Sequence, residues 1–441
     1  MFAFKDNKKS QGIHPPHFKI SKNNKIEPGP IPKTVNIPLS QHIGAPAQPL
    51  VKKGDSVKTG QKIAESEAFC SATIHSPVSG TVKKIVSSIN PASNAIVNTI
   101  QIESDEQDEW IELTENKDAE KLSKQKIIEL IKEAGIVGMG GATFPTHIKL
   151  QPPKDKPIDC VIVNGCECEP YITSDHRLMI ENADEILKGL SLCMNVLGVS
   201  KAYIGIEDNK PDAIIHMKKR IGELKLKGDI TVSELPAQYP MGAEKTLLKR
   251  ILGKEVPIGG LPMDVGVVVQ NVATLKAIHD AVYLGKPLIE RVVTITGDLK
   301  EHKNLLCRFG TSAQELIDYC GGAKGPLYKV IFGGPMMGIA QTTTDQPITK
   351  GTNCILVSKD KCPEETNCIR CGNCVNVCPQ NLMPMNYVAY VKKSLWEDLY
   401  QFHISNCVEC GSCAYICPAN IPIVQYIKTG KGQLKKLEAK Q

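Results

Sequence analysis

Residues 368–379 read CIRCGNCVNVCP, and residues 407–418 repeat the same spacing as CVECGSCAYICP. In each copy, two residues separate neighbouring members of the first three cysteines, three residues precede the fourth, and a proline follows it. Short Cys-x2-Cys turns let successive thiolates converge on one inorganic cluster. The repeat therefore decides the fold of the C-terminal part of the chain, which we expect to be a small helical domain built around metal.

This spacing is that of two-cluster bacterial ferredoxins, in which the fourth cysteine of each run ligates the other cluster. We expect a helix to carry that fourth cysteine. We therefore predict a ferredoxin-like domain over residues 355–425 with two [4Fe–4S] clusters. One would be held by Cys368, Cys371, Cys374 and Cys417, and the other by Cys407, Cys410, Cys413 and Cys378. Zinc also binds Cys-x2-Cys pairs, but it needs four ligands per site and has no use for the third step or the Cys-Pro ending. Just upstream, Cys354 and Cys362 are expected to be free buried thiols.

The composition of the 441 residues is that of a globular protein of several domains, with 41% apolar and 23% charged residues. The net charge of +6 is spread along the chain and predicts a solvated surface rather than a nucleic-acid-binding one, with an acidic docking partner as the alternative. Seventeen cysteines, with no apolar leader at Met1–Phe4 and no run of about 18 apolar residues, indicate metal chemistry in a reducing compartment. We expect a cytoplasmic protein.

The first half of the chain divides by its turn residues. Residues 1–35 are rich in proline, glycine and lysine and predict an extended N-terminal arm. Residues 36–105 predict short strands in a β sandwich or barrel. Their pattern VKKGDSVKTGQKIAE…SPVSGTV resembles the lipoyl/biotinyl carrier domain. Ala68 stands where a carrier has its modified lysine, so we expect a scaffold without a swinging arm.

From residue 118 to residue 286 the pattern alternates between apolar strands and amphipathic helices. Strands are expected at 158–163, 202–206 and 230–235. One helix is expected to be capped by Asn182 and to end at Gly198, and another to begin at Pro211. This βαβ rhythm predicts a Rossmann-like parallel sheet that binds ligands at the carboxyl ends of its strands. A strand-rich module follows at 288–350, and a basic tail is expected at 426–441.

Four polar stretches lie in or after this α/β region. They read GMGGATFPT (138–146), NGCECEP (164–170), YPMGAEKT (239–246) and VQNVATL (269–275). The first lacks the third glycine of a dinucleotide fingerprint, because Thr143 stands there. Its glycines still allow close backbone approach to a phosphate, and Pro145 is placed to open a helix whose N-terminus would face it. A plain turn is the alternative for the first stretch, and a solvated loop for the second.

In this order the four stretches resemble the flavin- and NADH-binding subunit of respiratory complex I and of NAD-reducing hydrogenases. Met139, Thr143 and Ala243 depart from that pattern. Together with GIHPPHFK (12–19) and the double cysteine run, these departures resemble the RnfC family of the Rnf electron-transport complex. The resemblance implies a multidomain α/β protein with a lipoyl-like β domain, a flavin/NADH domain, an SLBB-like β-grasp module and a ferredoxin domain. Microcompartment corrin reductases share this domain order and are the alternative, and a non-catalytic electron-relay protein is another.

The family resemblance also implies the cofactors and their contacts. FMN would lie in a cleft formed by Gly138, Gly140, Gly141, Lys149, Asn164, Glu167, Tyr239, Gly242, Asn271 and Thr274. Phe144 would stack on the nicotinamide, and Glu169 and Glu244 would line its ribose and ring side. Cys166 stands where complex I has an aspartate. No general acid or base is required, so no catalytic residue is named.

As a whole, the resemblance implies a peripheral subunit on the inner face of the cell membrane, which exchanges a hydride with NAD(H). Its partners would be the membrane subunits of an Rnf-type complex and an iron–sulfur subunit, with ferredoxin acting indirectly.

Overall fold

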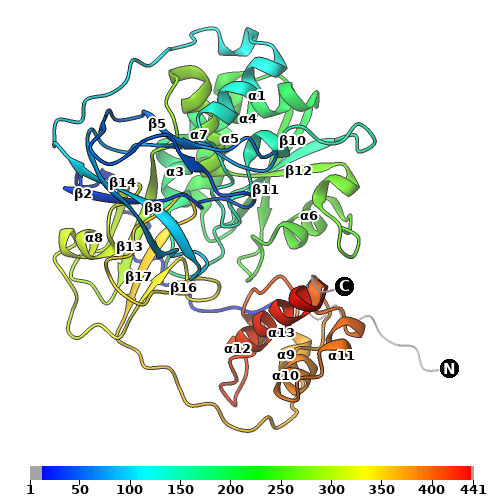
Figure 1. Ribbon diagram of the computed structural model, residues 1–441. Coiled ribbons are helices and arrows are strands. Elements are labelled where there is room, and N and C mark those ends of the chain that lie inside the picture. Colours follow the sequence, from blue (N-terminus) through cyan, green and yellow to red (C-terminus); the bar gives the residue numbers. More distant parts are fainter. Residues whose placement is uncertain (1–11, 439–441) are drawn as a thin grey trace.

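The computed structural model describes residues 12–438, which fold into four units packed against one another (Figure 1). The opening residues Met1–Phe4, from which we predict that there is no leader, and the last residues of the predicted tail lie outside the described residues. Within residues 12–438, no helix combines the length and the hydropathy needed to cross a bilayer.

The N-terminal unit is a β sandwich, as predicted. One sheet has the strand order β2-β8-β7-β4 and the other the order β3-β5-β6. The strands are β2 (Thr34–Pro38), β3 (Gln48–Pro49), β4 (Ser56–Val57), β5 (Lys62–Glu65), β6 (Ile74–His75), β7 (Gly80–Ile89) and β8 (Ile96–Ser104). Ile37, Ile63 and Ile100 lie fully buried in its core, because alternate residues of each strand point inward. Ala68 is exposed in the connection between β5 and β6.

The central unit contains four parallel strands in the order β11-β10-β9-β12, which confirms the predicted βαβ rhythm. The strands are β9 (Cys160–Asn164), β10 (Lys201–Glu207), β11 (Asp229–Leu235) and β12 (Val267–Asn271). The helices are η1 (Ala119–Lys121), α1 (Lys124–Glu133), α2 (Thr146–Lys149), α3 (Ser174–Glu181), α4 (Ala183–Leu197), α5 (Pro211–Leu224), α6 (Glu244–Leu252), η2 (Pro262–Val265) and α7 (Val272–Leu284). Because helices cover both faces of such a sheet, four successive residues of β9, Cys160–Val163, are buried.

Helix α4 begins and ends almost where the sequence predicts, but not by the predicted means at its start. Gly198 ends the helix in the left-handed conformation, with φ of 73°. Asn182 precedes α4, yet its side chain makes no capping hydrogen bond. Helix α3 ends at Glu181, and the backbone N–H of Asn182 donates to Leu178 O of that helix. One residue therefore closes α3 and opens α4, and its φ of −130° reflects this double role.

The third unit is a six-stranded mixed sheet with the order β1-β14-β13-β17-β15-β16 and one helix, α8. Its elements are β1 (Ile26–Pro28), β13 (Glu290–Gly297), β14 (Lys303–Arg308), α8 (Ala313–Tyr319), β15 (Lys329–Phe332), β16 (Ile339–Ala340) and β17 (Cys354–Ser358). Two strands come from outside the predicted module, β1 from the N-terminal arm and β17 from the segment given to the ferredoxin domain. Both supply backbone partners that an open sheet would lack.

Of the two cysteines upstream of the repeat, Cys354 lies on β17 and Cys362 lies beyond its end. Cys354 is a free thiol that is fully buried on β17, as predicted. Cys362 is free but exposed, so its predicted burial is wrong. It lies beyond the end of β17, in a segment without regular structure.

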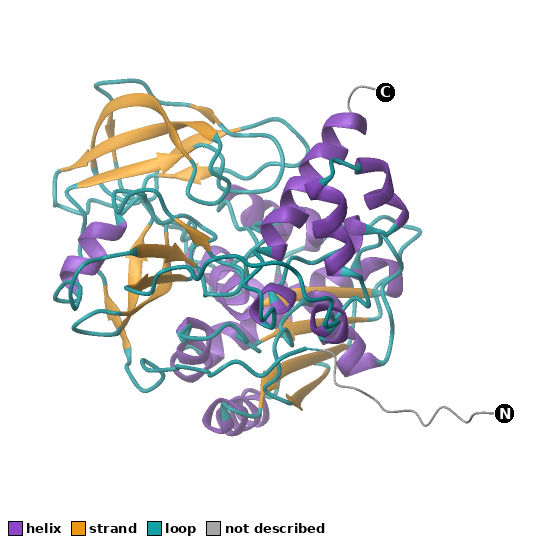
Figure 2. Ribbon diagram, turned by 90° about the horizontal axis from the view of Figure 1, so that it is seen from below, coloured by secondary structure: helices purple, strands orange, loops and turns teal. Residues whose placement is uncertain are grey.

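The C-terminal unit is the predicted helical ferredoxin-like domain, and Figure 2 shows its helices grouped apart from the strands of the sandwich. It contains α9 (Asn373–Asn376), α10 (Pro384–Lys392), α11 (Trp396–Gln401), η3 (Ile404–Asn406), α12 (Ser412–Tyr415) and α13 (Ile423–Glu438). The predicted basic tail falls largely within α13. This helix buries Ile423, Ile427, Gly430 and Leu434 along one face, at the spacing of an amphipathic helix.

Candidate functional site

The candidate residues gather at the carboxyl edge of the parallel sheet. From β9 the chain runs to β10 and β11 on one side and returns to β12 on the other side of β9. The strand order therefore reverses between β9 and β12, and open α/β sheets bind ligands at such a point. Asn164 and Asn271, the last residues of these strands, are register partners. Two amides that we predict to bind flavin thus lie side by side at this edge.

The glycine loop, residues 138–144, is closed on itself and tied to α7. The backbone N–H of Gly138 donates to Phe144 O at 2.9 Å, which closes the loop. The N–H of Met139 donates to Thr274 Oγ1 at 2.9 Å, and Thr274 is buried in the first turn of α7. Phe144 is half-buried. Three of the predicted site residues, Gly138, Phe144 and Thr274, therefore belong to one bonded arrangement.

The tip of this loop leaves the backbone accessible. A side chain on Gly140 would lie 3.2 Å from Asn271 Cβ, so the loop passes close to the end of β12. Gly141 has φ of 131° and open space where a side chain would stand. The Asn271 side chain is held by donation from Nδ2 to Asp175 Oδ2 at 2.6 Å. An anionic group could therefore approach the loop backbone without meeting side chains, which fits a phosphate of FMN.

The helix expected after Pro145 is only one turn long. It is α2, four residues without a side-chain cap, because its chain turns again at Leu150. Lys149, at its end, forms an ion pair with Glu244 at the start of α6, with 2.8 Å between Nζ and Oε1. Both side chains remain partly exposed, at 24% and 41%. Lys149, predicted to contact FMN, and Glu244, predicted to line the nicotinamide side, are thus ion-pair partners in the protein.

Asn164 joins the second and third polar stretches. Its Nδ2 donates to Gly242 O at 2.8 Å, and its Oδ1 accepts from the backbone N–H of Cys166 at 3.2 Å. A side chain on Gly242 would meet Cys168 Sγ at 3.1 Å, so this approach needs glycine. Cys166, which replaces the aspartate of complex I, is fully buried and faces Gly205 O. No acidic contact arises at that position.

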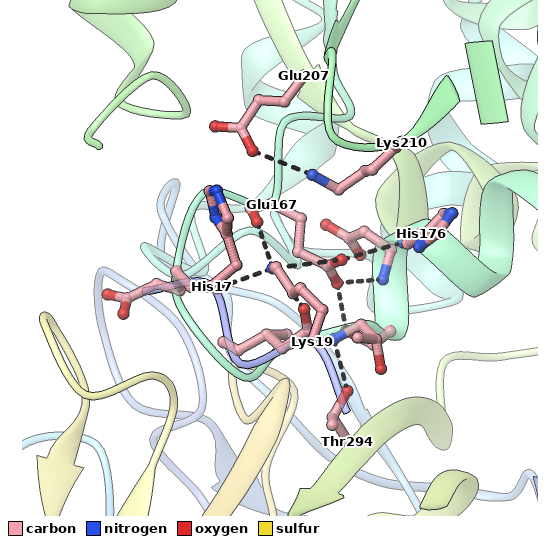
Figure 3. Close-up of polar contacts among 12 residues, drawn as sticks. His17, Lys19, Glu167, His176, Glu207, Lys210 and Thr294 are labelled. Atoms are coloured by element: carbon pink, nitrogen blue, oxygen red, sulfur yellow. Dashed lines mark hydrogen bonds and ion pairs between the residues drawn. The ribbon is translucent and has the colours of Figure 1, made fainter. Parts of the chain in front are cut away.

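Glu167 has protein partners that the sequence does not reveal. Its carboxylate accepts from the backbone N–H groups of Asp175, at 2.6 Å, and His176, at 3.3 Å, at the N-terminus of α3. From the N-terminal arm, Lys19 Nζ donates to three carbonyls of the same loop, those of Glu167, Glu169 and Ile172, at 2.6–2.8 Å (Figure 3). Glu167 thus stabilises the loop. Its predicted contact with flavin or ribose stays a prediction.

Glu169 and Tyr239 lie where three units meet. The Glu169 carboxylate accepts from the backbone N–H groups of Met336, at 3.1 Å, and Met337, at 2.8 Å, in the third unit. Burial raises the pKa of Glu169 to about 7. The Tyr239 hydroxyl lies 3.5 Å from Glu169 Oε1 and donates to Cys410 O, in the ferredoxin domain, at 2.6 Å. The carboxyl edge of the sheet therefore reaches the cysteine repeat.

Four of the eight cysteines predicted as cluster ligands lie close together. We name Cys378, Cys407, Cys410 and Cys413 the inner group, because they line a single cavity. Burial raises the pKa of Cys413, and the charges of Cys407, Cys410 and Cys378 raise it further, as expected for four close thiols. The fourth cysteine, Cys378, follows α9 rather than being carried by a helix. A cavity lined by four thiols from two chain segments fits a cluster.

We name Cys368, Cys371, Cys374 and Cys417 the outer group. Burial raises the pKa of Cys374, and the charges of Cys371, Cys417 and Cys368 raise it further. Cys368 and Cys371 are exposed, whereas Cys410 and Cys413 are buried. Within residues 12–438, no group of three or more His, Cys, Asp or Glu closes around a point as the ligands of a single ion would.

Two buried basic residues near the site, Lys210 and Arg291, belong to no sequence motif that would predict their contacts. Lys210, 2% exposed, donates to Cys166 O at 2.6 Å and pairs with Glu207 at 3.0 Å (Figure 3). Arg291, on β13 of the third unit, donates to Met139 O of the glycine loop at 3.1 Å. Their side chains bond backbone carbonyls, which every residue carries. Only the fold therefore identifies these contacts.

Comparison with known families divides the chain in the same order as the fold. Residues 7–107 match the RnfC barrel sandwich hybrid domain, and residues 131–280 match the Nuo51 FMN-binding domain. Residues 292–340 match the SLBB domain, and residues 367–421 match a 4Fe-4S dicluster domain.

Curated relatives decide the family. The chain is 49% identical to a subunit of the proton-translocating ferredoxin:NAD+ oxidoreductase complex of Clostridium ljungdahlii, over 88% of this chain and 85% of that one. It is 44% identical to the matching subunit of the Na+-translocating complex of Acetobacterium woodii, over 88% of each chain. The chain belongs to the RnfC family. A further member, from the ion-translocating oxidoreductase complex of Rhodobacter capsulatus, is 42% identical over 86% of this chain and 74% of that one.

Membership of the RnfC family gives the cofactors predicted from the sequence, FMN and two [4Fe–4S] clusters. A crystal structure of an NAD+-reducing [NiFe]-hydrogenase in the H2-reduced state matches with a TM-score of 0.52 and 18% identity, over 70% of this chain and 61% of that one. That likeness shows a shared fold. This chain combines the FMN-binding domain with the double cysteine run.

Proposed function

We propose that this chain is the NAD(H)-binding flavo-iron–sulfur subunit of a membrane-bound, ion-translocating ferredoxin:NAD oxidoreductase. One observation carries the proposal. The Tyr239 hydroxyl, in a stretch predicted to bind flavin, donates to Cys410 O, in the loop of the inner group, at 2.6 Å. The edge that would hold FMN and the loop that would hold a cluster are therefore in direct contact.

The residues of the carboxyl edge would hold FMN and NAD(H) as the resemblance implies. When bound, FMN exchanges a hydride for single electrons, and the clusters carry electrons singly. Gly140 and Gly141 would offer backbone to the phosphate, and Asn164 and Asn271 would offer amides at the strand ends. The protein supplies placement, so no side chain has to move a proton.

The cysteine groups would act in series. The inner group is in contact with the flavin domain through Tyr239. It also contacts the third unit through Gly411, where a side chain would lie 2.7 Å from Met336 O. The outer group contains the exposed cysteines Cys368 and Cys371. Electrons would therefore enter or leave the chain at the outer group, where another redox protein can come close.

The assembly is proposed from the family. Its curated members are named as subunits of ion-translocating complexes. We propose that this chain binds membrane subunits and an iron–sulfur subunit of such a complex, on the cytoplasmic side of the cell membrane. Ferredoxin would exchange electrons with the complex rather than directly with this chain.

The proposal is tested by anaerobic reconstitution with iron, sulfide and FMN, followed by absorbance titration with NADH. We expect FMN to remain bound through gel filtration, and NADH to bleach first the flavin band and then the cluster bands. NADPH, titrated separately, reports the nucleotide preference. If the clusters assemble but FMN washes off and neither nucleotide bleaches any band, the chain is an electron relay and the proposal fails.

A further inference from the structure

The two cysteine runs form equivalent loops, which we name the outer loop (residues 368–373) and the inner loop (residues 407–412). In the outer loop the N–H of Arg370 approaches Cys368 Sγ at 3.4 Å, and in the inner loop the N–H of Glu409 approaches Cys407 Sγ at 3.4 Å. Arg370 and Glu409 share the unusual φ of 56°. The loops therefore have the same backbone, and their residues can be compared one by one.

The inner loop is covered by the rest of the protein. Val408 packs against a cluster formed by Ile13, Tyr239 and Cys410. Ser412 is fully buried, and Gly411 lies against Met336 O, which a side chain would meet at 2.7 Å. The face formed by residues 408–412 is thus an interface with the flavin domain and the third unit.

The same face of the outer loop is bare. Ile369, the equivalent of Val408, is 70% exposed. Cys371 and Asn373 are exposed where their counterparts are buried. Gly372 has open space where Gly411 meets Met336. Ile369 therefore lies exposed beside two predicted cluster ligands, on the face of the outer loop that corresponds to the covered face of the inner loop. The covered face of the inner loop contacts the flavin domain.

The two loops differ in charge at one position. Glu409 of the inner loop forms an ion pair with Lys431 of α13, with 2.7 Å between Oε1 and Nζ. Its equivalent in the outer loop is Arg370, which is exposed and takes part in no ion pair with the residues that the structure describes. Lys392, on α10 of the same domain, is by contrast paired with Glu365, at 2.6 Å. The bare face therefore carries an unpaired positive charge next to its apolar residue.

We propose that the outer loop, centred on Ile369 and Arg370, is the docking surface for an acidic electron-transfer protein. Such a partner would cover Ile369 with apolar atoms, as Tyr239 and Ile13 cover Val408, and would place a carboxylate against Arg370. Opposite charges raise the rate of encounter and fix the orientation of the two proteins. This inference rests on the proposed function only for the presence of the clusters.

The test compares two protein electron acceptors of opposite charge. The chain with its clusters assembled is reduced with dithionite, excess reductant is removed, and stopped-flow absorbance follows electron transfer to plastocyanin, which is acidic, or to cytochrome c, which is basic. One electron passes in each encounter, reducing copper(II) to copper(I) or haem iron(III) to iron(II). At low salt, Arg370→Glu is expected to slow transfer to plastocyanin about tenfold and to speed transfer to cytochrome c about tenfold. Both effects shrink at high salt.

Opposite changes with the two acceptors separate docking from a change in cluster potential, which would move both rates in the same direction. The control is Lys218→Glu, the same kind of charge reversal at an exposed residue of α5, expected to leave both rates within twofold. If both rates move together, or neither moves, the inference is overturned. Should Arg370→Glu fail to hold its clusters, Arg370→Gln carries the test, with opposite changes of about threefold.

A second readout needs no electron transfer. Zinc-substituted plastocyanin is acidic and redox-inert, and its binding is measured by titration calorimetry. We expect Arg370→Glu to weaken binding about tenfold and Ile369→Ser to weaken it severalfold even at high salt, since its contribution is apolar. Unchanged binding in both variants would contradict the inference. Because neither experiment uses NADH or FMN, a failed NADH titration would count against the proposed function alone.

Discussion

At the scale of single residues, the buried ammonium of Lys19 organises the loop after β9. It reaches from the N-terminal arm to three carbonyl oxygens of that loop and lies 4.0 Å from Glu167 Oε2, with its side chain 11% exposed. Burial lowers the pKa of Lys19. The three carbonyls accept this charged donor in place of water. The N-terminal arm, which carries Lys19, is thus part of the site.

We therefore predict that Lys19→Met destabilises the protein by about 3 kcal/mol, because it leaves buried carbonyls without a donor. The midpoint of thermal unfolding, followed by circular dichroism, should fall by several degrees. Lys22→Met is the matched control on the same arm, since Lys22 is exposed. Equal midpoints for the two variants would show that the Lys19 contacts contribute nothing.

At the scale of elements, several segments work outside the unit in which the sequence places them. Strand β1 pairs with β14 and strand β17 with β13, so the sheet of the third unit takes strands from the arm and from the segment before the cysteines. The inner loop is likewise part of the interface between units. Each of these segments satisfies backbone groups that would otherwise lie at an edge.

The same glycine-to-alanine substitution can be made in the inner loop and in the outer loop, and the two variants differ only in whether the new side chain meets another unit. Gly411→Ala places a side chain 2.7 Å from Met336 O, whereas Gly372→Ala places one in open space. Both glycines have positive φ, 83° and 78°, so the backbone strain of the two substitutions is the same. We expect Gly411→Ala to slow the NADH-driven reduction of the clusters at least tenfold and Gly372→Ala to leave it within about twofold.

Stopped-flow absorbance with reconstituted protein measures both rates. Cluster content, determined from iron and sulfide, has to be equal in the two variants for the comparison to hold. Equal reduction rates at equal cluster content would show that the contact between Gly411 and Met336 has no part in joining the units.

At the scale of the whole molecule, Glu169 lies at the junction of three units. It bonds the turn at Met336 and Met337 and neighbours Tyr239, which bonds the ferredoxin domain. Its pKa is raised from an ordinary value of 4.5 to about 7, because burial outweighs the backbone hydrogen bonds to its carboxylate. Because Glu169 is buried where the three units meet, its ionisation destabilises the packing of the units against one another.

The raised pKa predicts a pH dependence of stability. The folded protein binds the proton more tightly than the unfolded chain, so this contribution to stability is complete below about pH 4.5 and is lost as the pH rises through about 7. Between pH 6 and pH 8.5 we expect the natural protein to lose about 1 kcal/mol more than Glu169→Gln. Urea unfolding at both pH values measures the difference. Exposed Glu234, changed to Gln, is the control and should leave the slope unaltered.

The sequence by itself determined the units and their cofactors. The cysteine spacing, the strand–helix rhythm and the four polar stretches each depend on residues close in the chain, and local spacing is enough to specify a cluster-binding run or a βαβ unit. The placement of Asn164 and Asn271 at neighbouring strand ends follows the same logic, because parallel strands end at one edge.

Only the tertiary structure decided how the units are joined and which candidate residues have partners within the protein. Lys19, Lys210 and Arg291 all bond backbone carbonyls, which carry no sequence signal. The assignment of Glu167 to the N-terminus of α3, and the difference between a covered inner loop and a bare outer loop, depend on contacts between distant segments. Two loops of nearly identical local sequence pattern receive different surroundings because burial is a property of the whole fold, not of the spacing that builds each loop.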